Sequence, residues 1–263
     1  MDLGIKNKVA VVTGGSKGLG KAVSFSLAQE GAKIAICSRD EKVLNEVKNE
    51  IEESYKTEIF VYPCDLRLKE DILKFKDEVI KRFETVHLLY INAGGPPTGS
   101  FFDFQDKDYI EAINLNLMST INLTYAFIKY MMEQKFGRIV ASTSISVKEP
   151  LSDIILSNVS RTPVVAFIKS ISREVAKYNI TANCVAPGYT MTDRLRKVVE
   201  NRAKKENITF EEELKKLSED IPMKRIGDPE EYADVVTFLL SERASYLTGV
   251  TLLIDGGTYK GLM

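Results

Sequence analysis

Short segments made almost entirely of apolar residues recur along this chain of 263 residues and alternate with longer segments that carry a helical pattern. Apolar strands without an in–out alternation are typical of parallel sheets covered by helices on both faces. The strand–helix rhythm therefore predicts an α/β protein with one doubly wound parallel sheet of about seven strands. The expected strands are Val9–Val12, Ile34–Cys37, Ile59–Tyr62, Leu88–Ile91, Ile139–Ala141, Thr181–Val185 and Val250–Ile254.

The segments between these strands fit the helices of a single domain that spans residues 1–263. Residues 41–55 carry one apolar stripe, and Asp40 is a candidate N-cap for that helix. Residues 193–222 differ, because they are dense in charge and only weakly amphipathic. They follow a strand end, where α/β proteins bind ligands, so we interpret residues 190–222 as a helical lid over a substrate. A solvated pair of surface helices is the alternative.

The overall composition argues against several classes of function. The 36 Lys and Arg side chains balance 37 Asp and Glu, which leaves a net charge of −1 and no basic surface of the kind that binds nucleic acid. No apolar run is long enough for a membrane span, and no apolar signal segment precedes the first strand, so we expect a cytoplasmic protein. Cys37, Cys64 and Cys184 lack metal-ligand spacing, and His87 is the only histidine. We expect neither a disulfide framework nor a metal site, and a structural role for His87.

A glycine-rich turn follows the first expected strand directly and leads into a helix. Its spaced glycines let the backbone approach a pyrophosphate closely, and the free N–H groups of the helix start can face that anion. The strand–turn–helix context indicates a dinucleotide-binding site. The expected contacts come from Gly14, Ser16, Lys17, Gly18, Leu19 and Gly20.

The spacing Thr-Gly-x-x-x-Gly-x-Gly of this turn resembles that of the short-chain dehydrogenase/reductase family. Further segments support the resemblance in the family's order along the whole chain. They are Asp65-Leu66, Asn92-Ala93-Gly94, Asn116, Pro187-Gly188 with Thr190 and Thr192, Arg225, Asp228-Pro-Glu-Glu and Ile254-Asp-Gly-Gly257. The resemblance implies a Rossmann-type oxidoreductase whose nicotinamide cofactor also contacts Asp65, Leu66, Asn92, Ala93, Gly94, Pro187, Gly188, Thr190 and Thr192.

The segment from Ser144 to Arg161 departs from the family's pattern at two positions. The resemblance implies that Ser144 orients a substrate carbonyl and that Asn116 supports a water relay. Where the family keeps a catalytic Tyr and, four residues later, a Lys, this chain has Ser157 and Arg161. Arg161 can still hold the nicotinamide ribose, but Ser157 is a poor proton donor compared with a phenol, whose pKa is about 10. Pro163 cannot donate a backbone hydrogen bond, so we expect the helix to kink or loosen there.

Other residues could supply the missing proton. Lys148 and Glu149 follow the expected catalytic serine closely, although a salt bridge at the rim is the simpler role for both. Tyr189 in the expected cofactor loop is a further candidate. Tyr125 and Lys129 spell the family's Tyr-x-x-x-Lys but precede the catalytic serine, so we interpret that match as coincidence.

The end of the second expected strand indicates which cofactor binds. Relatives that use NAD place an acidic residue there to bind the adenosine ribose. This chain has Ser38 and then Arg39, whereas Asp40 comes late and fits a helix cap better. Lys17 and Arg39 can both face the 2′-phosphate of NADP, so we predict NADP(H) over NAD(H).

Three functions remain open at this stage. The first is an NADP(H)-dependent reductase for carbonyl/alcohol pairs, with 3-oxoacyl thioesters among the candidates, because the segment after Ser144 resembles a sub-group similar to 3-oxoacyl-(acyl-carrier-protein) reductases. The second is an NADP(H)-binding protein with a sensing or assembly role, and the third is a lyase or isomerase. By analogy with the family we also predict a homodimer or homotetramer, with contacts at Val250–Ile254 and in residues 258–263.

Overall fold

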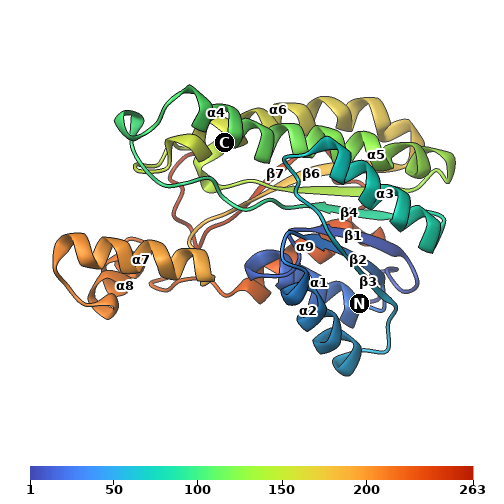
Figure 1. Ribbon diagram of the computed structural model, residues 1–263, viewed down its shortest axis with the longest axis horizontal. Coiled ribbons are helices and arrows are strands. Elements are labelled where there is room, and N and C mark those ends of the chain that lie inside the picture. Colours follow the sequence, from blue (N-terminus) through green and yellow to red (C-terminus); the bar gives the residue numbers. More distant parts are fainter. Residues whose placement is uncertain (263) are drawn as a thin grey trace.

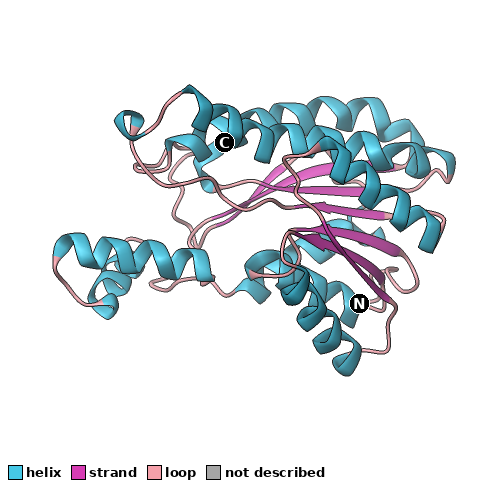
Figure 2. Cartoon of the chain, viewed as in Figure 1, coloured by secondary structure: helices cyan, strands magenta, loops and turns pink. Residues whose placement is uncertain are grey.

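Seven parallel strands form one sheet at the centre of the computed structural model, which describes residues 1–262 (Figures 1 and 2). The strand order is β3-β2-β1-β4-β5-β6-β7, so the chain starts in the middle and winds outward in both directions. This arrangement confirms the predicted doubly wound fold. The strands are β1 (Val9–Thr13), β2 (Lys33–Ser38), β3 (Ile59–Pro63), β4 (Leu88–Ile91), β5 (Gly137–Ser142), β6 (Ile180–Pro187) and β7 (Thr251–Ile254).

Most strands are longer than the apolar runs that predicted them. Polar residues join the ladder at their ends, because strand pairing uses the backbone and accepts any side chain that the surroundings tolerate. Thr13, for example, pairs with Cys37, and Ser38 pairs with Pro63. The prediction was wrong for Val250, which lies just before β7.

Helices cover both faces of the sheet, as the apolar strands require (Figure 1). One face carries α1 (Gly18–Gln29), α2 (Glu41–Ser54) and α9 (Pro229–Leu240). The opposite face carries α3 (Lys69–Phe83), α5 (Ser119–Glu133) and α6 (Ile155–Val175), and α4 (Asp106–Ile113) packs against α6. Asp40 caps α2 by accepting from the Val43 N–H, as predicted.

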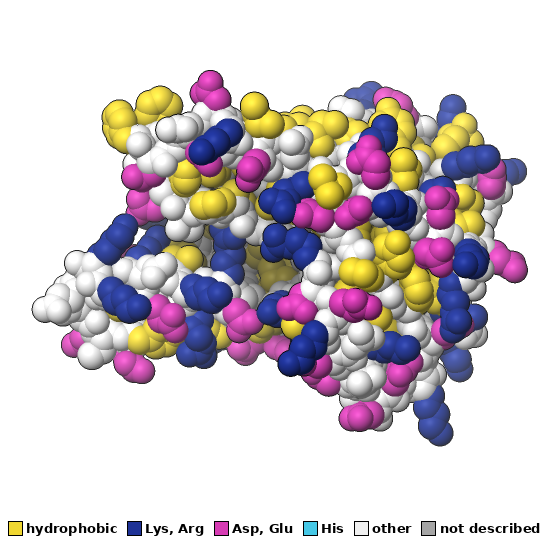
Figure 3. Space-filling model, in the orientation of Figure 1, with side chains coloured by type: hydrophobic (Ala, Val, Ile, Leu, Met, Phe, Trp, Pro, Cys, Tyr) yellow, Lys and Arg dark blue, Asp and Glu magenta, His cyan; other side chains and the backbone are white. Residues whose placement is uncertain are grey.

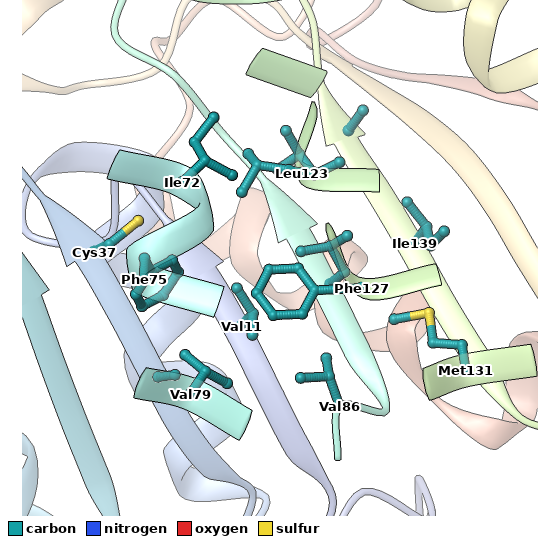
Figure 4. Close-up of a cluster of buried hydrophobic side chains, with 14 of the residues drawn as sticks. Val11, Cys37, Ile72, Phe75, Val79, Val86, Leu123, Phe127, Met131 and Ile139 are labelled. Carbon is teal, nitrogen blue, oxygen red and sulfur yellow. The ribbon is translucent and has the colours of Figure 1, made fainter. Parts of the chain in front are cut away.

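Two hydrophobic cores result, one on each side of the sheet. Figure 4 shows the core under α3 and α5, where Phe75 and Phe127 meet edge to face at a centroid distance of 6.3 Å. Cys37 lies in this core, and Cys64 and Cys184 are also buried free thiols. The tight packing of both layers fixes the strand ends, from which the candidate site is built.

His87 has the structural role that the sequence predicts. It lies just before β4, and its Nδ1 accepts a hydrogen bond of 3.0 Å from the backbone N–H of Val9 at the start of β1. Burial, and then the charge of Lys8, lower the pKa of His87, which favours the neutral ring that can accept this bond.

The charged segment after β6 forms two helices, α7 (Asp193–Glu206) and α8 (Phe210–Glu219), which stand apart from the sheet layers at the left of Figure 1. They enclose a small apolar cluster of their own around Leu195, Val199 and Leu217. Their amphipathic character is therefore stronger than the sequence suggested, because the few apolar residues all fall on the facing sides. No helix within residues 1–262 is long and apolar enough to span a membrane.

Candidate active site

The glycine turn between β1 and α1 is built by close backbone contacts. Gly14 and Gly18 have φ angles of 59° and 51°, which favour glycine. A Cβ atom at Gly20 would lie only 2.1 Å from the carbonyl oxygen of Gly14. The turn therefore brings its backbone against the first residues of α1, whose N–H groups can receive a phosphate.

Thr13 and Asn92 hold this turn against the end of β4. The Thr13 hydroxyl donates to the Asn92 carbonyl oxygen at 2.9 Å and accepts from the Asn92 N–H at 2.9 Å. The Asn92 side chain also donates to the Gly14 carbonyl oxygen at 3.3 Å. The predicted segment Asn92–Gly94 thus lies beside the predicted glycine turn.

A hollow beside the turn has the chemistry of a phosphate site. Ser16, Lys17, Ser38, Arg39 and Lys42 line it, together with Asp40 and Glu41. The Ser38 hydroxyl is buried and makes no hydrogen bond within residues 1–262. A buried hydroxyl without a partner beside cations fits a ligand that brings its own acceptor oxygens, as the 2′-phosphate of NADP does.

Two other predicted cofactor residues, Asp65 and Leu66, follow the end of β3, and Asp65 has a partner of its own. The Arg67 guanidinium donates to both Asp65 carboxylate oxygens and lowers the pKa of that carboxyl group. Leu66 is buried beside it. At the end of β6, a Cβ atom at Gly188 would meet the backbone of Asp255 at 2.8 Å, which makes this a second close backbone approach.

Ser144, Ser157 and Arg161 lie between the end of β5 and the first turns of α6. The Ser144 hydroxyl oxygen accepts from the Ser146 N–H at 3.1 Å, so its hydrogen remains free to donate. Ser157 is 5% exposed and belongs to the first turn of α6. Arg161 is 8% exposed and donates to the carbonyl oxygens of Ser142 at 3.1 Å and Ala93 at 3.4 Å. Burial, and then the nearby Arg194, lower the pKa of Arg161 to about 10, so it still carries its charge near neutral pH.

Asn116 lies within a π-helical turn, Asn114–Met118, which joins α4 to α5. Its amide donates to the Ser160 hydroxyl at 2.8 Å and thereby ties this turn to α6, while its Oδ1 atom is buried without a partner. A π-helical turn often marks a functional site, and no local sequence pattern predicted this one.

A chain of hydroxyl groups supports the site from below. Tyr90 of β4 donates to the hydroxyl of Tyr232 in α9 at 3.1 Å, and Tyr232 donates to the Ser142 hydroxyl at 3.0 Å. Both tyrosines are fully buried, and burial raises the pKa of Tyr232 to about 12. Ser142 then meets Arg161 through its backbone carbonyl, so the network fixes the strand ends on which the arginine rests.

Comparison with known proteins agrees with this geometry. A family model described as enoyl-(acyl carrier protein) reductase matches residues 14–259. The chain is 30% identical to 3-oxoacyl-(acyl-carrier-protein) reductase FabG of Aquifex aeolicus, with 98% of this chain and 100% of the relative covered. It is 32% identical to dehydrogenase/reductase SDR family member 4 of Bos taurus, with 98% and 89% covered.

The chain belongs to the short-chain dehydrogenase/reductase family. A solved structure of L-sorbose reductase from Gluconobacter frateurii, complexed with NADPH and L-sorbose, superposes with a TM-score of 0.96 at 30% identity and full coverage of both chains. The resemblance that the sequence indicated is confirmed, and so is its link to 3-oxoacyl-(acyl-carrier-protein) reductases.

Helix α6 spans Ile155–Val175 with Pro163 inside it, so the proline does not end the helix, and the kink or loosening expected there stays a prediction. One residue near the short-chain dehydrogenase/reductase site was not predicted. Arg194, which the sequence analysis did not single out, reaches from the first turn of α7 to donate to the Pro96 carbonyl oxygen at 2.9 Å. Its neighbour Thr192 caps α7 and lies against Gly18, so the start of α7 borders the cofactor turn.

The other residues considered as proton donors lie on the surface or pack against α7 and α8. Tyr125 is 76% exposed on α5, and Lys129 pairs with Glu133 one turn along the same helix, which agrees with a chance match. Lys148 and Glu149 are exposed after the short helical turn that follows Ser144. Tyr189 packs against the apolar cluster of α7 and α8.

A hollow separates the lobe of α7 and α8 from the rest of the molecule in the space-filling view (Figure 3). Dark blue Lys and Arg side chains gather around its edges. A groove of about 530 Å³ also runs between α1, α9 and the start of α7, and includes Gly18, Lys21 and Thr192 among its lining residues. This groove carries both signs of charge, since Glu50, Asp193, Glu230 and Asp234 line it together with Lys21 and Arg196.

Proposed function

We propose that the chain is an NADP(H)-dependent oxidoreductase that interconverts a carbonyl and an alcohol with an atypical proton donor. The observation that carries the proposal is the glycine turn, which Asn92 braces and whose residues Ser16 and Lys17 line the same hollow as Ser38 and Arg39. The L-sorbose reductase relative was solved with NADPH, which supports the same cofactor.

The cofactor residues follow from this turn and this hollow. Backbone groups from Gly14 to Gly20 would hold the pyrophosphate, and Lys17 with Arg39 would pair with the 2′-phosphate. The ends of β4 and β6 would line the nicotinamide half, through the predicted residues Asn92, Ala93, Gly94, Pro187, Gly188, Thr190 and Thr192. The reduced nicotinamide supplies the hydride when it is bound.

The protein's own contribution is to bind and polarise the carbonyl. The free hydroxyl hydrogen of Ser144 can donate to the substrate oxygen, since the Ser144 oxygen already accepts from the Ser146 N–H. The buried charge of Arg161 can stabilise the negative charge that develops on that oxygen and can also hold the ribose. Ser157 does not have the pKa of a general acid, so we propose water as the proton source.

The reductase can be tested by separating binding from turnover. NADPH binding is measured by fluorescence, and cofactor oxidation is then followed with a panel of neutral ketones, ketoacids and 3-oxoacyl thioesters. We expect micromolar binding and slow turnover on part of the panel. Tight binding without any turnover would instead support a cofactor-binding protein, a role favoured only by the replacement of the family's tyrosine with Ser157.

We further propose a homodimer or homotetramer that uses the edge of the sheet. β7 is an edge strand, and Tyr246, Val250 and Leu252 around it are at least one-third exposed. Exposed apolar residues along an unpaired edge favour a second copy as partner. The predicted contact at residues 258–263 includes Met263, which lies outside the described residues. A monomer in gel filtration at micromolar concentration would contradict this, and a cytoplasmic location remains a prediction from the sequence.

A further inference from the structure

Two arginines from distant parts of the chain converge on the loop that follows β4. Arg161 of α6 donates to the carbonyl oxygen of Ala93, and Arg194 of α7 donates to that of Pro96, only three residues later. The contact of Arg194 with the loop is close. A Cβ atom at Gly95 would lie 1.6 Å from its Nη1 atom, so the guanidinium fills the space that a side chain would take.

Neither arginine has an acidic partner. None of the ion pairs within residues 1–262 includes Arg161 or Arg194. Surface arginines elsewhere behave differently. Arg67 pairs with Asp65, and Arg225 donates to both carboxylate oxygens of Glu231.

The two guanidinium groups carry like charges, which repel each other. Arg161 is buried, and the crowded surroundings of the Arg194 guanidinium lower the pKa of that side chain by desolvation. Arg194 also lowers the pKa of Arg161, as expected for like charges in proximity. A guanidinium has five N–H donors, and these two groups use only part of them on backbone carbonyls.

We propose that Arg194, supported by the charge of Arg161, binds a carboxylate or phosphate group of the substrate. This inference rests on the proposed reductase function, and it narrows the substrate class to small carbonyl compounds that carry an anionic group. Arg194 as a residue is exposed, so an arriving solute can reach it, and its planar fork suits two oxygens at once. A bound anion would offset both positive charges.

The position of Arg194 also gives the anion an effect on the helical lobe. Arg194 belongs to the first turn of α7, and Thr192 at the start of the same helix lies against Gly18. An anion held between Arg194 and Arg161 would therefore join α7 to the ends of β4 and β5. The predicted lid would then close on anionic substrates in particular.

The test measures binding and does not depend on turnover. The background is a Lys17→Gln/Arg39→Gln/Lys42→Gln variant, which removes the three cations that line the expected 2′-phosphate hollow. Malonate, inorganic phosphate and uncharged malonamide are titrated by calorimetry into this background and into the same background with Arg194→Gln, Arg194→Lys or, as a matched control, Lys197→Gln from the exposed side of α7.

We expect malonate or phosphate to bind and malonamide not to bind, with the stronger anion identifying a carboxylate or a phosphate site. Arg194→Gln should weaken that binding at least tenfold, Arg194→Lys should weaken it less, and Lys197→Gln should leave it unchanged. Anion binding that is undetectable, or equal with and without Arg194, would overturn the proposal. Because the readout is binding, a failed reductase assay would leave the result interpretable.

Discussion

The glycine turn and the first turns of α6 are specified in different ways. The turn depends on backbone geometry, as the 2.1 Å approach at Gly20 shows, and most of its side chains could change without altering it. At the start of α6, by contrast, the proposed chemistry depends on two side chains, Ser157 and Arg161, which are both buried. The comparison teaches that cofactor binding and turnover can be separated within one short-chain dehydrogenase/reductase fold, because they depend on different kinds of information in the sequence.

The strongest way to break this comparison is to restore the family's residues in α6. A Ser157→Tyr/Arg161→Lys variant should raise kcat on a reactive ketone by roughly 10²–10⁴-fold, which is the usual contribution of a positioned general acid. NADPH affinity should change only a few-fold, because the glycine turn is untouched. Steady-state kinetics with NADPH absorbance gives both values.

A control for this variant separates the phenol hydroxyl from the bulk of the ring. Ser157→Phe/Arg161→Lys inserts a similar ring beside the buried Asn116 turn but brings no acid. If both variants gained equally, the hydroxyl would not be the cause. If neither variant raised kcat while both stayed folded, the rest of the site would not support catalysis. The alternative of a cofactor-binding protein would then be favoured.

The opposite region is tested with Gly20→Ala. The added Cβ would meet the Gly14 carbonyl oxygen at 2.1 Å, so we expect the turn to open, with a loss of about 1–3 kcal/mol in the free energy of unfolding. NADPH binding should fall by about 100-fold, since the backbone can no longer follow the pyrophosphate. Urea unfolding and fluorescence titration measure the two effects.

Gly94→Ala is the matched control for stability. A Cβ atom there meets nothing within 4 Å, so the free energy of unfolding should change by less than about 1 kcal/mol. Gly94 is also a predicted cofactor contact. A stable Gly94→Ala protein that binds NADPH weakly would place the cofactor on that side of the loop, whereas unchanged binding would contradict the contact.

The preference for NADPH over NADH tests the cofactor-binding region further. Lys17→Gln/Arg39→Gln removes two cations from the hollow around Ser38. We expect NADPH affinity to fall by roughly 10–100-fold, as for a lost charge-assisted hydrogen bond, while NADH affinity stays the same. Lys56→Gln, an exposed cation outside this hollow, serves as the control. Equal losses for both cofactors would remove the assignment of a 2′-phosphate site.

The smallest expected effect concerns the stability of the sheet at His87, which lies outside both the glycine turn and α6. The pKa of His87 is lowered in the folded protein, so the unfolded chain takes up the proton first as the pH falls. This contribution to stability is present above the ordinary His pKa of about 6.5 and is lost as the pH drops below it. The free energy of unfolding, measured with urea, should fall less between about pH 7.5 and pH 5 in His87→Asn than in the wild type. The asparagine side chain can still accept the hydrogen bond from the Val9 N–H. A larger fall in the free energy of unfolding in the variant than in the wild type would contradict this role of His87.

The fold and the cofactor side were largely predictable from the sequence, because they rest on apolar periodicity and glycine spacing that are local along the chain. The α6 substitutions were also visible, since Ser157 and Arg161 fall at fixed distances from Ser144. Arg194 was not predictable, because its contact with Pro96 joins residues 98 positions apart and its neighbours in sequence are also charged. The π-helical turn at Asn116 and the continuous helix at Pro163 depend on tertiary packing, which the local pattern does not reveal.

The hydroxyl chain beneath the site has a consequence for alkaline conditions. Tyr90 and Tyr232 are buried with raised pKa values, and the chain has no tryptophan to obscure its 11 tyrosines. These two phenols should stay protonated in the native protein at pH values where a free phenol, whose pKa is about 10, ionises. Since the unfolded chain releases both protons more readily, their contribution to stability is present below about pH 10 and is lost above it. An ultraviolet titration should therefore show two late phenols whose ionisation coincides with unfolding, an optical marker for the floor of the active site.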